Sequence, residues 1–147
     1  MAANQPTTQI LMDDGAKTVV KVTGYYNTAA SNANTQIINA KTLAFANSSQ
    51  NCILTLIGVQ YSVDLSTGFV QLAWEGVSSN TEILTFGTST TGTFSGWFPN
   101  NATNPTGNVT ISVYGAQPND CYNFILILNK EPHLGYANAY LGYNNFG

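Results

Sequence analysis

The sequence predicts an all-β domain, an antiparallel β-sandwich or jelly roll of about eight strands with extended N- and C-terminal arms. Short runs rich in Val, Ile, Tyr, Phe and Thr alternate with clusters of Gly, Asn, Ser and Pro, which is typical of strands and turns. Helical periodicity is scarce. The length of 147 residues suits one domain with a sizeable core.

The expected strands follow one another closely, as they do in a sandwich or barrel. In chain order they are Lys17–Tyr26, Thr35–Ala40, Cys52–Val63, Phe69–Glu75, Thr81–Phe86, Thr93–Phe98, Gly107–Tyr114 and Cys121–Lys130. A short helix is expected near Asn39–Ala46, with Asn39 as its N-cap. The predicted parts of the chain are an N-terminal arm over residues 1–16, the jelly-roll domain over 17–130 and a C-terminal arm over 131–147.

The segment from Leu56 to Gly76 holds a tryptophan beside a carboxylate, Trp74 and Glu75, which suggests a ligand site at first sight. Successive side chains of a strand point to opposite faces, so Trp74 is expected in the core and Glu75 in solvent. The preceding strand offers a matching inward set, which is Ile57, Val59, Tyr61 and Val63. We therefore expect the two strands to form a central hairpin that buries one common face.

The last expected strand has an uninterrupted apolar run, Phe124–Leu128. Such a run predicts burial on both faces, either by a second layer or by another subunit. The C-terminal arm that follows is rich in Tyr, Gly and Asn. Disordered segments are usually poor in aromatic residues, whereas aromatic side chains are common anchors at interfaces. Free disorder and an arm that orders on a neighbouring subunit both remain open.

Charge excludes some classes of partner. Only 7% of the residues are charged, the formal net charge is −3, and the four basic residues are scattered lysines. Nucleic-acid binding needs clustered Lys and Arg, so no nucleic-acid partner is expected. The apolar runs are too short to span a membrane, and the N-terminus lacks the features of a secretory signal, so we expect no membrane partner and synthesis in the cytoplasm.

No residues form a recognisable catalytic or metal-binding set. The single histidine, His133, lies in the C-terminal arm, and a glycosidase pair would have to come from the isolated carboxylates Asp64, Glu75 and Glu82. Asp13-Asp14 is expected to be an exposed pair. Cys52 and Cys121 lack the spacing of a metal or redox motif and are expected to be free thiols. The sequence thus predicts no enzyme, no cofactor and no metal.

Several stretches in fixed order resemble a known family. They are Val19–Lys21, Ile38–Leu43, Tyr61–Val63, Gly68, Val70, Leu72, Trp74-Glu75, Pro105–Val109, Asp120, Tyr122 and the apolar run closing at Lys130. Together they resemble the jelly-roll decoration or cement proteins of tailed-bacteriophage heads, over about residues 17–130. The chain departs from that pattern at Asn39 and Asn108, where aspartate is expected, at Glu75, which replaces an aspartate, and at Asn129, which replaces an arginine. At Asn39, Asn108 and Asn129 the exchange removes a charge.

The resemblance implies a non-enzymatic virion protein that binds the outer surface of a phage capsid, bridging capsomers and stabilising the head. The implied partners are the major capsid protein and further copies of the chain, as a dimer or trimer. We assign the candidate contacts to the C-terminal arm, and they are Leu134, Tyr136, Tyr140, Leu141, Tyr143 and Phe146. Deletion after Lys130 is expected to leave the domain folded and to abolish oligomerisation or capsid binding.

The alternative is a carbohydrate- or receptor-binding jelly-roll domain of a phage tail or fibre protein. Its candidate loop contains Trp97, Phe98, Asn100 and Asn101. An aromatic ring can stack on a sugar, and asparagine side chains can bind its hydroxyl groups. Complete burial of Trp97 would remove this alternative.

Overall fold

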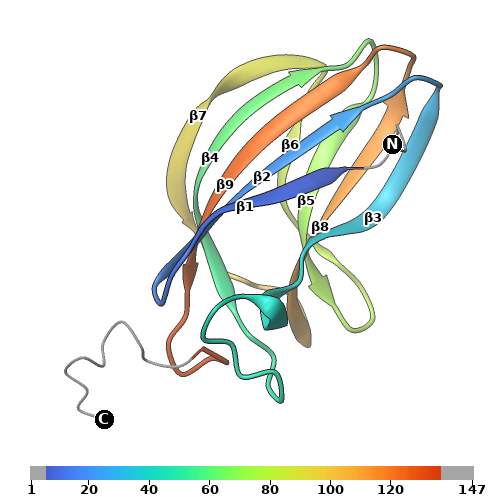
Figure 1. Ribbon diagram of the computed structural model, residues 1–147. Coiled ribbons are helices and arrows are strands. Elements are labelled where there is room, and N and C mark those ends of the chain that lie inside the picture. Colours follow the sequence, from blue (N-terminus) through green and yellow to red (C-terminus); the bar gives the residue numbers. More distant parts are fainter. Residues whose placement is uncertain (1–5, 137–147) are drawn as a thin grey trace.

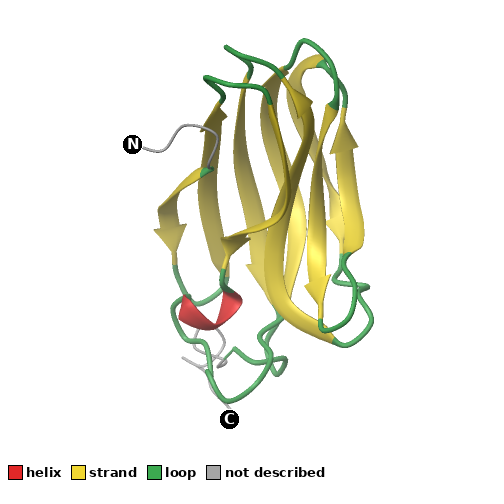
Figure 2. Cartoon of the chain, turned by 90° about the vertical axis from the view of Figure 1, so that its right-hand side faces the viewer, coloured by secondary structure: helices red, strands yellow, loops and turns green. Residues whose placement is uncertain are grey.

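Two antiparallel β-sheets lie face to face in the computed structural model, which describes residues 6–136 (Figure 1, Figure 2). The strands are β1 (Thr7–Asp13), β2 (Lys17–Tyr25), β3 (Ala30–Ile38), β4 (Leu54–Asp64), β5 (Phe69–Gly76), β6 (Thr81–Phe86), β7 (Ser89–Phe98), β8 (Pro105–Ala116) and β9 (Cys121–Lys130), with a 3-10 helix η1 (Ala40–Thr42). Sheet A has the order β1-β2-β9-β4-β7, and sheet B has the order β3-β8-β5-β6. From β2 to β9, every connection except β5–β6 crosses between the sheets. The predicted jelly roll is confirmed.

The core lies between the sheets because apolar residues alternate with polar ones along most strands. On β9, Phe124, Leu126 and Leu128 are at most 1% exposed, while the residues between them are only partly buried. Trp74 on β5 is 1% exposed and Glu75 faces outward, as the alternation predicts. The Glu75 carboxylate accepts hydrogen bonds from Thr106 Oγ1 at 2.7 Å and Asn108 Nδ2 at 3.0 Å.

The central hairpin predicted for Leu56–Gly76 is wrong. β4 pairs with β9 and β7 in sheet A, whereas β5 pairs with β8 and β6 in sheet B. The two strands do bury apolar faces against each other, but across the core and not side by side. Periodicity shows which face of a strand is apolar, and it does not show which strand is its hydrogen-bonded neighbour.

A β-bulge shifts the register of β4 between Leu56 and Gly58. As a result Leu56 is 1% exposed and enters the core, while Ile57, which was expected there, is only half-buried. Val59 and Val63 point inward as predicted. A bulge cannot be foreseen from alternation alone, because it changes the alternation itself.

Residues 7–13, expected in the N-terminal arm, form the edge strand β1 of sheet A. All but its last residue are exposed, so the segment lacks the alternation that predicts a strand. The expected helix near Asn39 is present as the short helix η1, and the Asn39 side chain accepts a hydrogen bond from the Lys41 backbone N at 3.2 Å. The N-cap prediction is therefore confirmed, for a helix shorter than expected.

Candidate docking surface

An apolar row crosses the outer face of sheet A. Met12 on β1 lies opposite Val19 on β2, and Val19 lies opposite Ile127 on β9. We call Met12, Val19 and Ile127 the apolar row. On β4 the next position is Gly58, and a Cβ built there would lie only 3.3 Å from Ile127 Cδ1. The glycine therefore gives Ile127 room beside β4.

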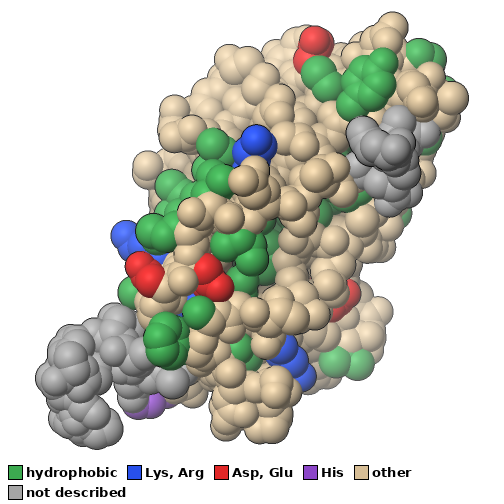
Figure 3. Space-filling model, viewed as in Figure 1, with side chains coloured by type: hydrophobic (Ala, Val, Ile, Leu, Met, Phe, Trp, Pro, Cys, Tyr) green, Lys and Arg blue, Asp and Glu red, His purple; other side chains and the backbone are tan. Residues whose placement is uncertain are grey.

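The apolar row is open to solvent in the part of the chain that the structure describes. Met12 is 40% exposed, and Val19 and Ile127 are half-buried. Leu11, at the bulge of β1, is 45% exposed, and Ile125 adds a second apolar side chain on β9. Hydrophobic side chains gather over β1, β2 and β9 in Figure 3. Within residues 6–136, the burial predicted for Phe124–Leu128 is thus found on the inner face and not on the outer one.

Polar residues border the apolar row. The neighbouring row of the same face runs from Gln9 through Lys21, Ile125 and Gln60 to Thr93. A shallow hollow of about 380 Å³ continues the surface toward β7, and its lining residues are Gln60, Tyr61, Ser62, Gly92, Thr93, Asn123, Phe124 and Ile125. Lys17 and Lys21 on β2 supply the positive charge of this face. The surface is mostly uncharged, with an apolar centre.

A buried lysine fixes β1, and with it Met12, against the rest of sheet A. Lys130 Nζ donates hydrogen bonds to Asp13 Oδ1, the Asp14 carbonyl oxygen and, at 2.8 Å, the Ala44 carbonyl oxygen. These acceptors match the three N–H groups of an ammonium. Asp13 Oδ2 also accepts from Ala44 N at 2.8 Å. Asp13 is therefore a partly buried ion-pair partner, which corrects the expectation of an exposed Asp13-Asp14 pair.

Asp14 closes the turn between β1 and β2. Its Oδ1 accepts hydrogen bonds from the backbone N–H groups of Lys17 and Ala16, each at 2.8 Å. These bonds lower the pKa of the Asp14 carboxyl, because they stabilise its charged form. The turn and the Lys130 ion pair together set the register that places Met12 beside Val19.

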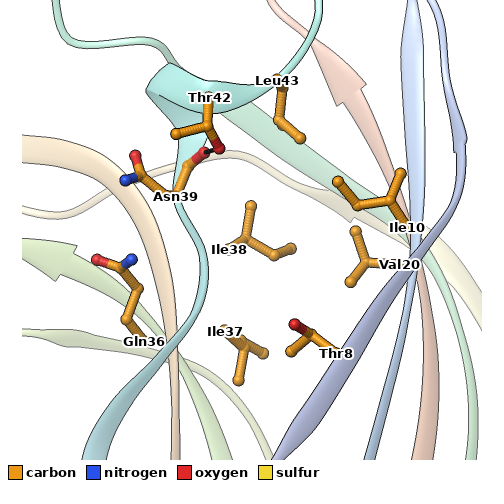
Figure 4. A pocket seen from close by; sticks show the side chains of 9 residues that line it. All are labelled: Thr8, Ile10, Val20, Gln36, Ile37, Ile38, Asn39, Thr42 and Leu43. Atoms are coloured by element: carbon orange, nitrogen blue, oxygen red, sulfur yellow. Dashed lines mark hydrogen bonds between the residues drawn. The ribbon is translucent and has the colours of Figure 1, made fainter.

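A groove opens at the edge of the sandwich between β1 and β3. It has a volume of about 270 Å³, and its lining residues are Thr8, Ile10, Val20, Gln36, Ile37, Ile38, Asn39, Thr42 and Leu43 (Figure 4). Ile10 is 53% exposed and lies opposite Val20, so it stands at the mouth of the groove. The lining carries no charged residue. The groove continues the exposed apolar surface of β1 around the edge of sheet A.

The C-terminal contacts predicted from the sequence separate into three groups. Leu134 is 51% exposed and remains available to a partner. Tyr136 is 3% exposed, and its hydroxyl donates to the Ala40 carbonyl oxygen at 2.8 Å, so the expectation that it contacts another chain is corrected. The ring packs into the chain's own core beneath η1, and burial raises the pKa of its phenol. The remaining four lie outside the described residues, and they are Tyr140, Leu141, Tyr143 and Phe146.

The loop proposed for the alternative function is partly accessible. Complete burial of Trp97 would have removed that alternative, but Trp97 is 61% exposed. Phe98 is half-buried and packs against Phe94 with ring centroids 5.3 Å apart. Asn101 is exposed, whereas Asn100 is half-buried and its Oδ1 accepts from Ala102 N at 3.0 Å. Trp97 and Asn101 are therefore the two members that a ligand can reach directly.

Within residues 6–136 no group of three or more His, Cys, Asp and Glu side chains lies close enough to hold a metal ion. Cys52 and Cys121 are free, as expected. Burial raises the pKa of the Cys52 thiol. Over the same range, no helix is long and apolar enough to cross a membrane.

No family model matches this chain, and no curated protein matches it either. Among solved structures, it is similar to Bacillus endospore appendages described as disulfide-linked pili, with 15% identity, a TM-score of 0.41, and coverage of 88% of this chain and 93% of that one. A cupin domain from Bordetella pertussis matches with 9% identity, a TM-score of 0.37, and coverage of 90% and 99%. A family 29 carbohydrate-binding module matches with 8% identity, a TM-score of 0.38, and coverage of 86% and 93%.

Proposed function

We propose that this chain is a non-enzymatic structural protein of a phage head, which docks on the outer surface of the capsid through the outer face of sheet A. The observation that carries the proposal is the apolar row, Met12, Val19 and Ile127, on the outer face of sheet A. Contiguous exposed apolar surface often marks a protein interaction site, because covering it removes it from water. The capsid as partner follows from the sequence resemblance.

The composition of the face suits a permanent protein contact. A stable specific interface buries on the order of 1,000 Å² or more, and full burial of a valine or isoleucine side chain contributes about 1.5–3 kcal/mol. Lys17 and Lys21 supply the charge beside the apolar row, so the dependence of binding on salt should be modest. A chain that bridges neighbouring capsomers in this way would stabilise the head against internal pressure.

The test uses heads of the parent phage assembled without this protein. The double variant Val19→Thr, Ile127→Thr keeps β-branched side chains and removes apolar surface from the apolar row. We expect co-sedimentation with heads to weaken about tenfold or more, from the lost burial of apolar groups. Val77→Thr, a similar exchange at a 71% exposed side chain outside sheet A, is the matched control and should bind normally. Unchanged binding of the double variant would refute docking through this face.

A carbohydrate-binding role is the second candidate, and the 61% exposure of Trp97 favours it. The chain has two tryptophans, and Trp74 is buried, so quenching of fluorescence by an added glycan reports on Trp97. If Trp97 stacks on the sugar, Trp97→Ala abolishes glycan binding, which is measured by titration calorimetry because the substitution also removes the fluorophore. Absence of quenching across a panel of host-surface glycans would exclude Trp97 as their binding residue.

A further inference from the structure

The outer edge of β7 is the free edge of sheet A opposite β1. In the strand order of the described residues, β7 has β4 as its neighbour on one side and no strand on the other. Its pairing with β4 is regular from Ser89 to Ser95, with one shift beyond that point. Eight of its ten residues are exposed. The backbone groups along its outer side are therefore accessible to another strand.

From Ser89 to Ser95, β7 lacks the features that normally prevent edge pairing, and its one register shift lies beyond Ser95. Natural edge strands are protected by charged residues, prolines or bulges. Between Ser89 and Phe98 there is no charged residue and no proline. The other sheet edges differ. β1 has a bulge and ends at Asp13, β6 has Glu82 and a register shift, and β3 has three register shifts. β7 is thus the edge best suited to accept a further strand.

We propose that β7 pairs with β7 of a second copy of this chain, antiparallel and about a two-fold axis at Thr93, so that sheet A continues from one copy into the other. A two-fold contact uses the same surface on both copies, so it must be self-complementary. The uncharged β7 meets this condition, because pairing it with itself brings no like charges together. This inference does not depend on which partner covers the apolar row.

The register follows from Phe94 and Gly92. Both lie on the core side of β7, opposite Val59 and Tyr61 of β4. With Thr93 on the axis, Phe94 of one copy lies opposite Gly92 of the other, and symmetry creates this contact twice. The Tyr61 side chain already covers Gly92, since a Cβ there would lie 2.9 Å from Tyr61 Oη, so the Phe94 ring of the second copy would lie against Tyr61. Phe94 is 40% exposed in the single chain, so the pairing covers an exposed aromatic ring.

A second feature of this edge supports the same occupant. A groove of about 250 Å³ opens between β6 and β7, and its lining residues are Tyr61, Leu84, Thr85, Phe86, Gly87, Thr90 and Phe94. The second copy would cover its open side while extending sheet A. The paired segment is about 30 Å long, which puts the contact at the small end of specific interfaces. We therefore expect a weak dimer in solution, which high local concentration on a lattice would favour.

Introducing a charge of either sign at Thr93 tests the proposal. This side chain is exposed, and on the axis it lies opposite its own copy. Thr93→Lys and Thr93→Glu should each be monomeric at millimolar concentration, where the unaltered chain dimerises, because like charges meet. An equimolar mixture should restore the dimer, because opposite charges meet, and sedimentation equilibrium measures all three states. Thr7→Lys on β1, also exposed, is the control and should leave dimerisation unchanged.

A cross-link provides the second measurement. Thr93→Cys, made together with Cys121→Ser, should form a disulfide-linked dimer on mild oxidation, because directly opposed residues of paired strands lie within disulfide reach. Thr7→Cys in the same background should not. An unaltered chain that stays monomeric at millimolar concentration would overturn the proposal, as would a dimer that survives in both charge variants.

Discussion

At the scale of single residues, Asp120 shows how this weakly charged chain uses a carboxylate. The side chain lies before β9 and is 4% exposed. Its Oδ1 accepts from Ser66 N at 3.0 Å and Ser66 Oγ at 2.8 Å, and its Oδ2 accepts from Gln117 N at 2.7 Å. Burial alone would raise the pKa of Asp120, but these hydrogen bonds outweigh it and lower the pKa. Asp120 thereby ties the β4–β5 crossing to the start of β9.

We expect Asp120→Asn to lower the free energy of unfolding by about 2 kcal/mol at neutral pH, since it weakens hydrogen bonds to a charged acceptor. The folded pKa lies below the unfolded value, so this stabilisation is complete above pH of about 4 and is lost as the pH falls through the folded pKa. Urea unfolding between neutral and acid pH measures both effects. The variant should lose less stability than the unaltered chain on acidification, and an equal loss in both would rule out this role.

At the scale of elements, the alternation of apolar and polar side chains predicted most strands. It failed where a segment is a strand only because it pairs with a neighbouring strand. β5, β6 and β9 begin where the sequence placed them. The sequence did not predict β1 because the Ile10-Leu11-Met12 run lacks alternation. The segment is a strand because it pairs with β2. The same run was the one indication in the sequence of the apolar surface on sheet A, because three successive apolar residues are unexpected in a polar arm. β3 and β7 begin earlier than predicted, since their first residues, Ala30–Asn34 and Ser89–Gly92, are mostly small or polar and do not show the apolar alternation of a strand.

The first residues of the C-terminal segment belong to the folded domain, so deletion after Lys130 does not test the arm alone. Residues 131–136 return to the domain, where Ile53 N donates to the Leu134 carbonyl oxygen at 2.8 Å and Asn47 N to that of Gly135 at 2.7 Å. Gly135 has a positive φ of 98°, and a Cβ there would lie 2.4 Å from Cys52 Cα. Only glycine fits this close approach. Deletion after Lys130 would therefore remove part of the core.

We expect a chain that ends at Tyr136 to unfold at nearly the temperature of the full chain, because it keeps these contacts. A chain that ends at Lys130 should be less stable by about 3–5 kcal/mol, the usual effect of losing a large buried aromatic side chain. Thermal unfolding followed by circular dichroism compares the three lengths. Equal melting temperatures for the two shortened chains would contradict the structural role of Tyr136. The chain ending at Tyr136 is also the correct one for testing the arm in oligomerisation.

At the scale of the whole molecule, the fold brings distant segments into one surface. The sequence predicted β2 and β9 as strands, but the apolar row requires Met12, Val19 and Ile127 to be neighbours, and that depends on register. Register results from the bulge in β1 and the Lys130 ion pair, which have no periodic signature. The apolar row lies on β1, β2 and β9, and β4 separates it from β7. One copy can therefore dock through the face and pair through the edge.

The most direct test of the account is to image the parent phage particle at side-chain resolution. We expect the chain on the outside of the head, with Met12, Val19 and Ile127 covered by the major capsid protein and the β7 edge available to a second copy. A head-bound chain whose outer sheet A face is open to solvent would contradict docking through the apolar row. A chain located in the tail, with Trp97 against a glycan, would contradict the proposed function itself.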